Sequence, residues 1–91
     1  MTSQAVTVVN QLGMHARAAA KFVHLAARFD ARVKVARDRR EMDGKSIMGL
    51  LLLAAARGSS ITITADGPDE SAALAALCAL VERGFDELRC D

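Results

Sequence analysis

Residues 4–29 read QAVTVVNQLGMHARAAAKFVHLAARF, and their hydrophobic pattern changes from strict alternation to a helical period within that stretch. At its start, Val6 and Val8 fall on one side and their neighbours on the other, which is the pattern of a half-buried strand. From Ala16 to Phe29 the apolar side chains recur at three- and four-residue spacing, which is typical of an amphipathic helix. The sequence therefore predicts a strand, a glycine-containing loop and then a helix.

The remaining residues continue to alternate between strands and helices. We expect strands at 31–37, 41–43 and 60–65, a helix from Ile47 to about Ala56, and a helix from about Pro68 to Arg83. The resulting order is β-α-β-β-α-β-α. With so few strands, the simplest way to bury the apolar faces is one sheet with all the helices on one side, in a single α+β domain spanning residues 1–91.

Several residues predict where these elements end. Ser46 is placed to cap the second helix, and Gly58 to end it. Gly84 ends the last helix, after which Phe85 and Leu88 dock on the core. The turn between the second and third strands lacks the glycine that tight hairpins prefer.

Composition excludes several classes of protein. The 91 residues carry 12 Lys and Arg against 11 Asp and Glu, a formal charge of +1 that argues against nucleic-acid binding driven by bulk charge. The aromatic residues are three Phe, with no Trp or Tyr, so a base-stacking platform is not expected. The apolar runs are too short for a membrane-spanning helix, and residues 1–4 lack a basic stretch followed by an apolar one, so we expect no membrane insertion and no signal peptide. Because the two cysteines make no disulfide framework, we expect a reduced, cytosolic protein.

His15 is the first candidate for chemistry, because it falls between the loop and the first helical turn. The backbone amides of Ala16, Arg17 and Ala18 would be among the unpaired donors of that turn, and a helix start favours an exposed anion by roughly 0.3–1 kcal/mol. The Arg17 guanidinium adds a planar fork of donors for phosphate oxygens. A neutral imidazole offers a ring nitrogen as a nucleophile. This pattern predicts a place where a histidine could accept a phosphoryl group.

Two other roles for His15 have to be weighed. It could be a loop or capping histidine without chemistry, which is the commoner case for such a residue. It could also bind a metal together with His24, but the two are nine residues apart, on different helical faces, and neither a Cys nor an acid stands at ligand spacing. We therefore predict no metal site.

Ser46 is the second candidate. As a helix cap it contributes about 1 kcal/mol relative to Ala, and it could also be a site of regulatory phosphorylation, since the two roles are compatible. Residues 44–46, GKS, resemble the end of a phosphate-binding P-loop. However, Arg39 stands where that motif needs another glycine, so no nucleotide site is predicted.

The second predicted helix is apolar nearly all round and too short to bury every side chain. An exposed patch of Ile47, Met48 and Leu51 is therefore expected, and Met suits an adaptable contact surface. His24 lies on the polar stripe of the first helix, where it is solvated or at an interface. Cys78 belongs to the buried stripe of the last helix, and Cys90 to the tail.

Two segments resemble the histidine-containing phosphocarrier proteins (HPr) of the bacterial phosphotransferase system. Residues 13–17 (GMHAR) with 19–23 (AAKFV) resemble their active-site segment, and residues 44–50 (GKSIMGL) resemble their regulatory-serine segment. The similarity continues through Gly58, 61–63 and 67–70, so it covers essentially the whole chain. It implies an open-faced β-sandwich, in which a four-stranded antiparallel sheet carries three helices on one face.

The resemblance also implies a function. His15 would accept a phosphoryl group on Nδ1 from phosphorylated Enzyme I and pass it to a IIA-type protein, with Arg17 as the active-site arginine. Ser46 would be the serine that a bifunctional HPr kinase/phosphorylase modifies with ATP. The chain would then be a covalent carrier rather than a stand-alone enzyme, without a cofactor, and we expect it to be a monomer.

The same resemblance assigns a docking surface. Ile47, Met48 and Leu51 match the family's apolar contact surface, together with the exposed side of the first helix around Ala20 and His24.

The chain departs from the family in places. Ala18 stands where the family has Pro, which removes no reacting group but could loosen the helix start by up to ~1 kcal/mol. Residues 13–15 and 84–87 resemble the nitrogen-related branch (NPr), whereas the intact Ser46 segment resembles the kinase-regulated branch. The choice between sugar transport and a regulatory phosphorelay therefore stays open.

Two alternative functions follow from the same residues. The domain could be a regulatory module that binds a small anion at the helix start without covalent phosphate, an analogy from fold alone. It could also be an HPr paralogue that acts only through phosphorylated Ser46, although the presence of both His15 and Arg17 speaks against this.

Overall fold

Four strands and three helices make up the protein in this computed structural model, which describes residues 1–86. The elements are β1 (Thr2–Thr7), α1 (Ala16–Ala26), β2 (Arg32–Arg37), β3 (Arg40–Asp43), α2 (Ile47–Leu53), β4 (Ser60–Asp66) and α3 (Glu70–Glu82). Their order is the predicted β-α-β-β-α-β-α. Leu88 and Cys90 lie outside the described residues.

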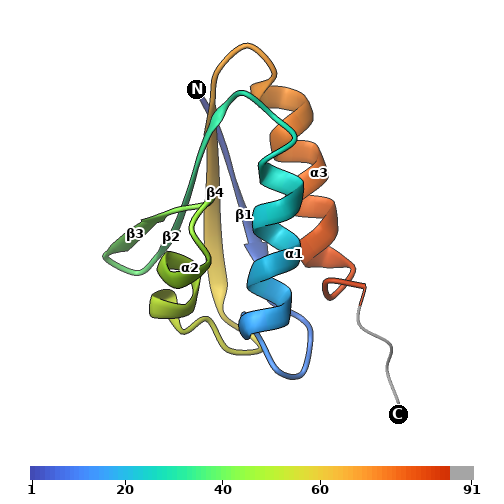
Figure 1. The fold of residues 1–91 in the computed structure, drawn as a ribbon. Helices are drawn as coiled ribbons and strands as arrows, with labels where there is room; N and C mark the ends of the chain where they lie inside the picture. The colour runs from blue at the N-terminus through green and yellow to red at the C-terminus, as the bar shows by residue number, and fades with distance from the viewer. Residues whose placement is uncertain (87–91) are drawn as a thin grey trace.

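The strands form one antiparallel sheet in the order β1-β4-β2-β3. β1 pairs with β4, with Val6 opposite Ile61; β4 pairs with β2, with Ile63 opposite Val35. β2 and β3 form the hairpin, with Val35 opposite Met42. The three helices lie on one side of this sheet (Figure 1). The predicted α+β fold, an open-faced β-sandwich, is confirmed.

The core lies between the sheet and the helices. Alternate strand residues such as Val33, Val35, Ile61 and Ile63 are buried, while their neighbours in sequence face outward. The predicted apolar face of α3 is buried as well, and burial raises the pKa of the Cys78 thiol there. The buried face of α1 consists mostly of small side chains, and this helix packs against both α2 and α3. The buried residues of α1 are Ala18, Ala19, Phe22 and Ala26.

The second helix is shorter than predicted, and Gly58 does not end it. α2 stops at Leu53, and Ala54 takes the left-handed conformation with φ 52°. The guanidinium of Arg37 donates to the Leu53 carbonyl at 2.9 Å, and that of Arg40 donates to the Leu52 carbonyl at 3.0 Å. The β2–β3 hairpin thus supplies donors to the last carbonyls of α2, which have no partner within the helix.

The first helix also ends early, at Ala26 rather than Phe29. The residues that follow it form tighter turns, in which each amide donates to the carbonyl three residues earlier. The Arg28 amide donates to the Leu25 carbonyl and the Phe29 amide to the Ala26 carbonyl, both at 3.1 Å. This tightening is common at helix ends.

The last helix begins at Glu70 rather than at Pro68. Asp69 precedes it, and its two carboxylate oxygens accept hydrogen bonds from the amides of Asp30 and Ala31 at 2.9 and 2.8 Å. The hydrogen bond from Asp30 is the main reason that the pKa of the Asp69 carboxyl is lowered. At the other end, Gly84 (φ 70°) follows the helix and Phe85 is fully buried, as predicted.

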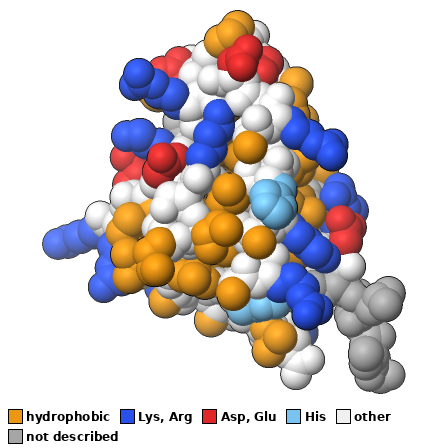
Figure 2. Space-filling view, in the orientation of Figure 1, with side chains coloured by type: hydrophobic (Ala, Val, Ile, Leu, Met, Phe, Trp, Pro, Cys, Tyr) orange, Lys and Arg blue, Asp and Glu red, His pale blue; other side chains and the backbone are white. Residues whose placement is uncertain are grey.

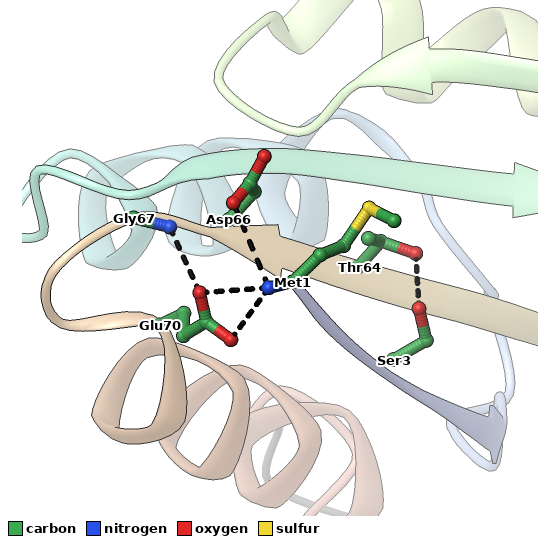
Figure 3. A network of polar contacts seen from close by, with 6 residues as sticks. All are labelled: Met1, Ser3, Thr64, Asp66, Gly67 and Glu70. Carbon is green, nitrogen blue, oxygen red and sulfur yellow. Dashed lines mark hydrogen bonds and ion pairs between the residues drawn. The ribbon is translucent and has the colours of Figure 1, made fainter.

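A polar network joins the start of β1 to the start of α3 (Figure 3). The Met1 ammonium lies 2.9 Å from one Glu70 carboxylate oxygen and donates to the other at 3.0 Å, and it is 3.6 Å from an Asp66 oxygen. The Gly67 amide also donates to Glu70, at 3.1 Å. The hydrogen bond from Met1 lowers the pKa of Glu70, and the same bond raises the pKa of the Met1 amino group.

None of the helices within residues 1–86 is long and apolar enough to cross a membrane.

Candidate functional site

The loop that carries His15 is tied to the segment that follows α2. The Met14 amide donates to the Ala55 carbonyl at 2.9 Å. Gly13 has φ 66°, and a Cβ atom placed on it would lie 2.4 Å from the Ala55 carbonyl oxygen and 2.9 Å from the Ala56 Cα. Only glycine combines this conformation with this close approach. The loop geometry around His15 therefore depends on Gly13.

His15 occupies the N-cap position of α1 in an extended conformation, with φ −80° and ψ −179°. Its carbonyl accepts the first helical hydrogen bond, from the Ala19 amide at 2.8 Å. Within the described residues, its side chain makes no capping hydrogen bond, and the residue is partly exposed. The imidazole is thus not used to cap the helix, although the backbone of His15 holds the capping position.

The amides of Ala16, Arg17 and Ala18 come before the first hydrogen bond of the helical ladder, as predicted for the start of a helix. Arg17 is exposed in this turn, and Ala18 is buried. The helix dipole adds a partial positive charge at the same place. The three amides that the sequence predicts as donors therefore lie in one helical turn, directly after His15.

Ser46 caps α2, as the sequence predicts. Its Oγ accepts a hydrogen bond from the Gly49 amide at 3.0 Å. The turn before it is closed by Asp43, whose carboxylate accepts from the Lys45 amide at 2.9 Å and whose carbonyl accepts from the Ser46 amide at 3.1 Å. The Lys45 ammonium donates to the Phe29 carbonyl at 2.7 Å, which links this turn to the end of α1.

An exposed apolar patch lies beside Ser46, and it differs in one residue from the predicted one. Ile47 is 39% exposed and Met48 65%, as expected, but Leu51 is only partly exposed and packs against the core. Leu52, which was not among the predicted residues, is 55% exposed. Met48 and Leu52 are four residues apart and therefore share one helical face. The exposure of Leu52 could thus have been predicted from the helical period. We call Ile47, Met48 and Leu52 the apolar patch.

The remaining predicted contact residues lie on α1. His24 is exposed and Ala20 partly so, and α1 and α2 pack against each other. Figure 2 shows hydrophobic side chains gathered over α2 and the neighbouring part of α1, with histidine side chains beside them and Lys and Arg along the adjoining edge. The two helices that carry the predicted contact residues thus lie side by side.

The family model described as "PTS HPr component phosphorylation site" matches residues 2–83. The phosphocarrier protein HPr of Cupriavidus necator is 48% identical over 87 residues, covering 96% of this chain and 98% of that protein. The phosphocarrier protein NPr of Shewanella violacea is 45% identical over 82 residues, covering 90% of each chain. The crystal structure of HPr-C-His from Thermoanaerobacter tengcongensis superposes with a TM-score of 0.93 at 36% identity, covering 98% of this chain and 100% of that one.

These matches extend over nearly the whole chain and include relatives of both the HPr and the NPr kind, in agreement with the mixed signals of the sequence. The chain belongs to the HPr family of phosphocarrier proteins of the phosphotransferase system.

Proposed function

We propose that His15 is the residue that carries the phosphoryl group, taking it from phosphorylated Enzyme I and giving it to a IIA-type protein. In the first step the Nδ1 lone pair attacks phosphorus, a P–N bond forms, and the donor leaves with the electron pair of the bond that breaks. In the second step an acceptor nucleophile attacks the same phosphorus, and the electron pair of the P–N bond returns to His15. The protein is then ready for another cycle and consumes no cofactor.

The observation that carries this proposal is the position of His15, which is partly exposed and stands at the N-cap of α1. The amides of residues 16–18 and the Arg17 guanidinium are suited to hold the phosphoryl oxygens in line for transfer. A carrier must also release what it accepts, and only preferential stabilisation of the transition state speeds a step. A partly exposed site with a few donors meets both needs.

The test is incubation with Enzyme I and phosphoenolpyruvate, followed by a search for acid-labile phosphate. We expect one phosphate per chain in the wild type and in His24→Ala, which removes the other histidine, and none in His15→Ala. Replacing Arg17 by Ala should slow transfer by roughly tenfold or more, because a charged donor to the phosphoryl oxygens is lost. Reversible binding of inorganic phosphate without covalent labelling would instead support an anion-binding module.

We further propose that Ser46 is phosphorylated by an HPr kinase/phosphorylase and that this weakens docking to Enzyme I. A phosphate there adds close to two negative charges next to Ile47 and Met48. It also remains at a helix start, where negative charge is favourable, so the modification should change the surface without unfolding α2. Phosphopeptide mapping after incubation with the kinase and ATP tests the site. Unchanged transfer kinetics in the modified protein would contradict the effect.

The docking surface proposed for both protein partners consists of Ala20 and His24 on α1 with Ile47, Met48 and Leu51 on α2, to which the exposure of Leu52 adds a sixth residue. We propose that the protein works in the cytosol as a monomer, and sedimentation at micromolar concentration tests the oligomeric state. Transfer assays with IIA proteins of the sugar and the nitrogen-related systems would decide between the two branches.

A further inference from the structure

Asn10 is a buried polar residue in the loop between β1 and α1. It is 7% exposed, and among residues 1–86 no other polar or charged residue is buried. Its Nδ2 donates to the Gly13 carbonyl at 2.7 Å. An amide is buried at a cost unless it is hydrogen-bonded, so a short bond in this position constrains both partners.

The acceptor of that bond also contacts His15. The backbone amide of His15 donates to the same Gly13 carbonyl oxygen at 2.9 Å, and the Gly13 amide donates back to the Asn10 carbonyl at 3.1 Å. The Asn10 side chain and the His15 backbone therefore meet on one oxygen atom. A rotation of the Gly13 peptide would break both bonds together.

Asn10 also lies close to the segment that follows α3. A Cβ atom on Gly84, just after α3, would lie 3.5 Å from the Asn10 Cβ and 3.9 Å from its Cα. The segment that follows α3 therefore lies next to Asn10. Asn10 connects the core to the loop that carries His15.

We propose that Asn10 is a positioning residue for His15: its Nδ2 donor fixes the Gly13 carbonyl and, through the His15 amide, the direction in which the imidazole leaves the backbone. The inference rests on the proposed function of His15 as the carrier. In-line transfer depends on the placement of the nucleophile, and an error of about 1 Å can cost on the order of 100-fold in rate. Asn10 touches neither phosphate nor partner in this role.

The experiment compares Asn10→Ala and Asn10→Asp with Val33→Ala as a control. Asn10→Asp keeps the shape of the side chain and loses the donor. Val33 is buried in β2 at the opposite end of the sheet, level with Thr2 and Ala65, so its truncation lowers stability without touching the loop. For each variant, NMR measures hydrogen exchange of the His15 amide, and rapid quench measures the rate of phosphorylation by Enzyme I.

We expect the His15 amide to exchange at least about tenfold faster in both Asn10 variants than in the control, and phosphorylation to be roughly tenfold slower at an unchanged final stoichiometry. If the Asn10 variants match the control in both measurements, the positioning role is wrong while the carrier function stands. If the wild type takes up no phosphate, the proposed function is wrong. The exchange data then still show whether Asn10 fixes His15. Should Asn10→Ala not fold, Asn10→Asp carries the comparison.

Discussion

Gly13 and Ala55 lie backbone to backbone, at a separation that leaves no room for a side chain on Gly13. A Cβ atom there would be 2.4 Å from the Ala55 carbonyl oxygen, and this oxygen also accepts the Met14 amide at 2.9 Å. The loop that carries His15 is thereby fastened to the chain that follows α2. A change at this contact should reach the histidine.

Gly13→Ala should destabilise the protein by roughly 2–3 kcal/mol, because it adds a steric collision to the cost of a left-handed conformation. Gly58→Ala is the matched control: Gly58 has φ 89°, and among the described residues no atom lies within 4 Å of its Cβ position. Gly58→Ala should cost roughly 1–2 kcal/mol, the cost of the left-handed conformation alone. Urea unfolding measures both, and equal losses would show that the approach to Ala55 is unimportant.

Ser46→Ala should lower the free energy of unfolding by about 1 kcal/mol, because the Gly49 amide loses its acceptor. Ser46→Asp should keep most of that stability, since a carboxylate can accept the same bond and its charge is favourable at a helix start. Both variants are measured by denaturant unfolding. A loss as large for Asp as for Ala would contradict a capping role.

Met48→Lys and Leu52→Lys should weaken docking to Enzyme I, because each removes an exposed apolar contact of the apolar patch. We expect KM for transfer to rise about tenfold, with stability changed by less than about 0.5 kcal/mol. Thr62→Lys makes the same change of charge on the outer face of the sheet, where Thr62 is exposed. A similar KM for all three variants would exclude the patch as a docking surface.

Asp69→Asn should lower the denaturation midpoint at pH 7, because an amide cannot accept from both Asp30 and Ala31. The pKa of Asp69 is lowered in the folded protein from its ordinary 3.8. The carboxylate therefore stabilises the fold above pH 3.8, and this contribution is lost as the pH falls below 3.8 toward the folded-state value.

The difference in denaturation midpoint between Asp69→Asn and the wild type should accordingly become smaller as the pH falls below 3.8. Asp30→Asn, which leaves both amide donors in place, serves as the control and should retain the wild-type acid profile. If the denaturation midpoints of Asp69→Asn and the wild type differ by the same amount from pH 7 to pH 2, the ionised carboxylate is not what stabilises the wild type.

Local sequence patterns were sufficient to predict the strands and the helices. The alternation around Val6 and Ile63 and the helical period around Phe22 reflect which side chains face the core, and each is confirmed by burial. The Ser46 cap could also be predicted, because a capping bond joins residues three apart.

Features that depend on distant residues could not be predicted in this way. The end of α2 at Ala54 coincides with donors from Arg37 and Arg40, which belong to the β2–β3 hairpin. The start of α3 coincides with the bonds of Asp69 to the segment before β2. In the candidate site, the bond from Asn10 to Gly13 joins residues only three apart, but Asn10 is buried and lies next to Gly84, which is distant in the sequence.

The pairing of β1 with β4 along its whole length has a consequence for biosynthesis. A nascent chain that has left the ribosome only as far as residue 59 contains the histidine motif, but its first strand has no partner. Because such non-local pairing must precede assembly, folding should begin only once Asp66 has emerged. A prematurely terminated chain would then contain His15, the proposed carrier, without the folded surface that is proposed to bind Enzyme I.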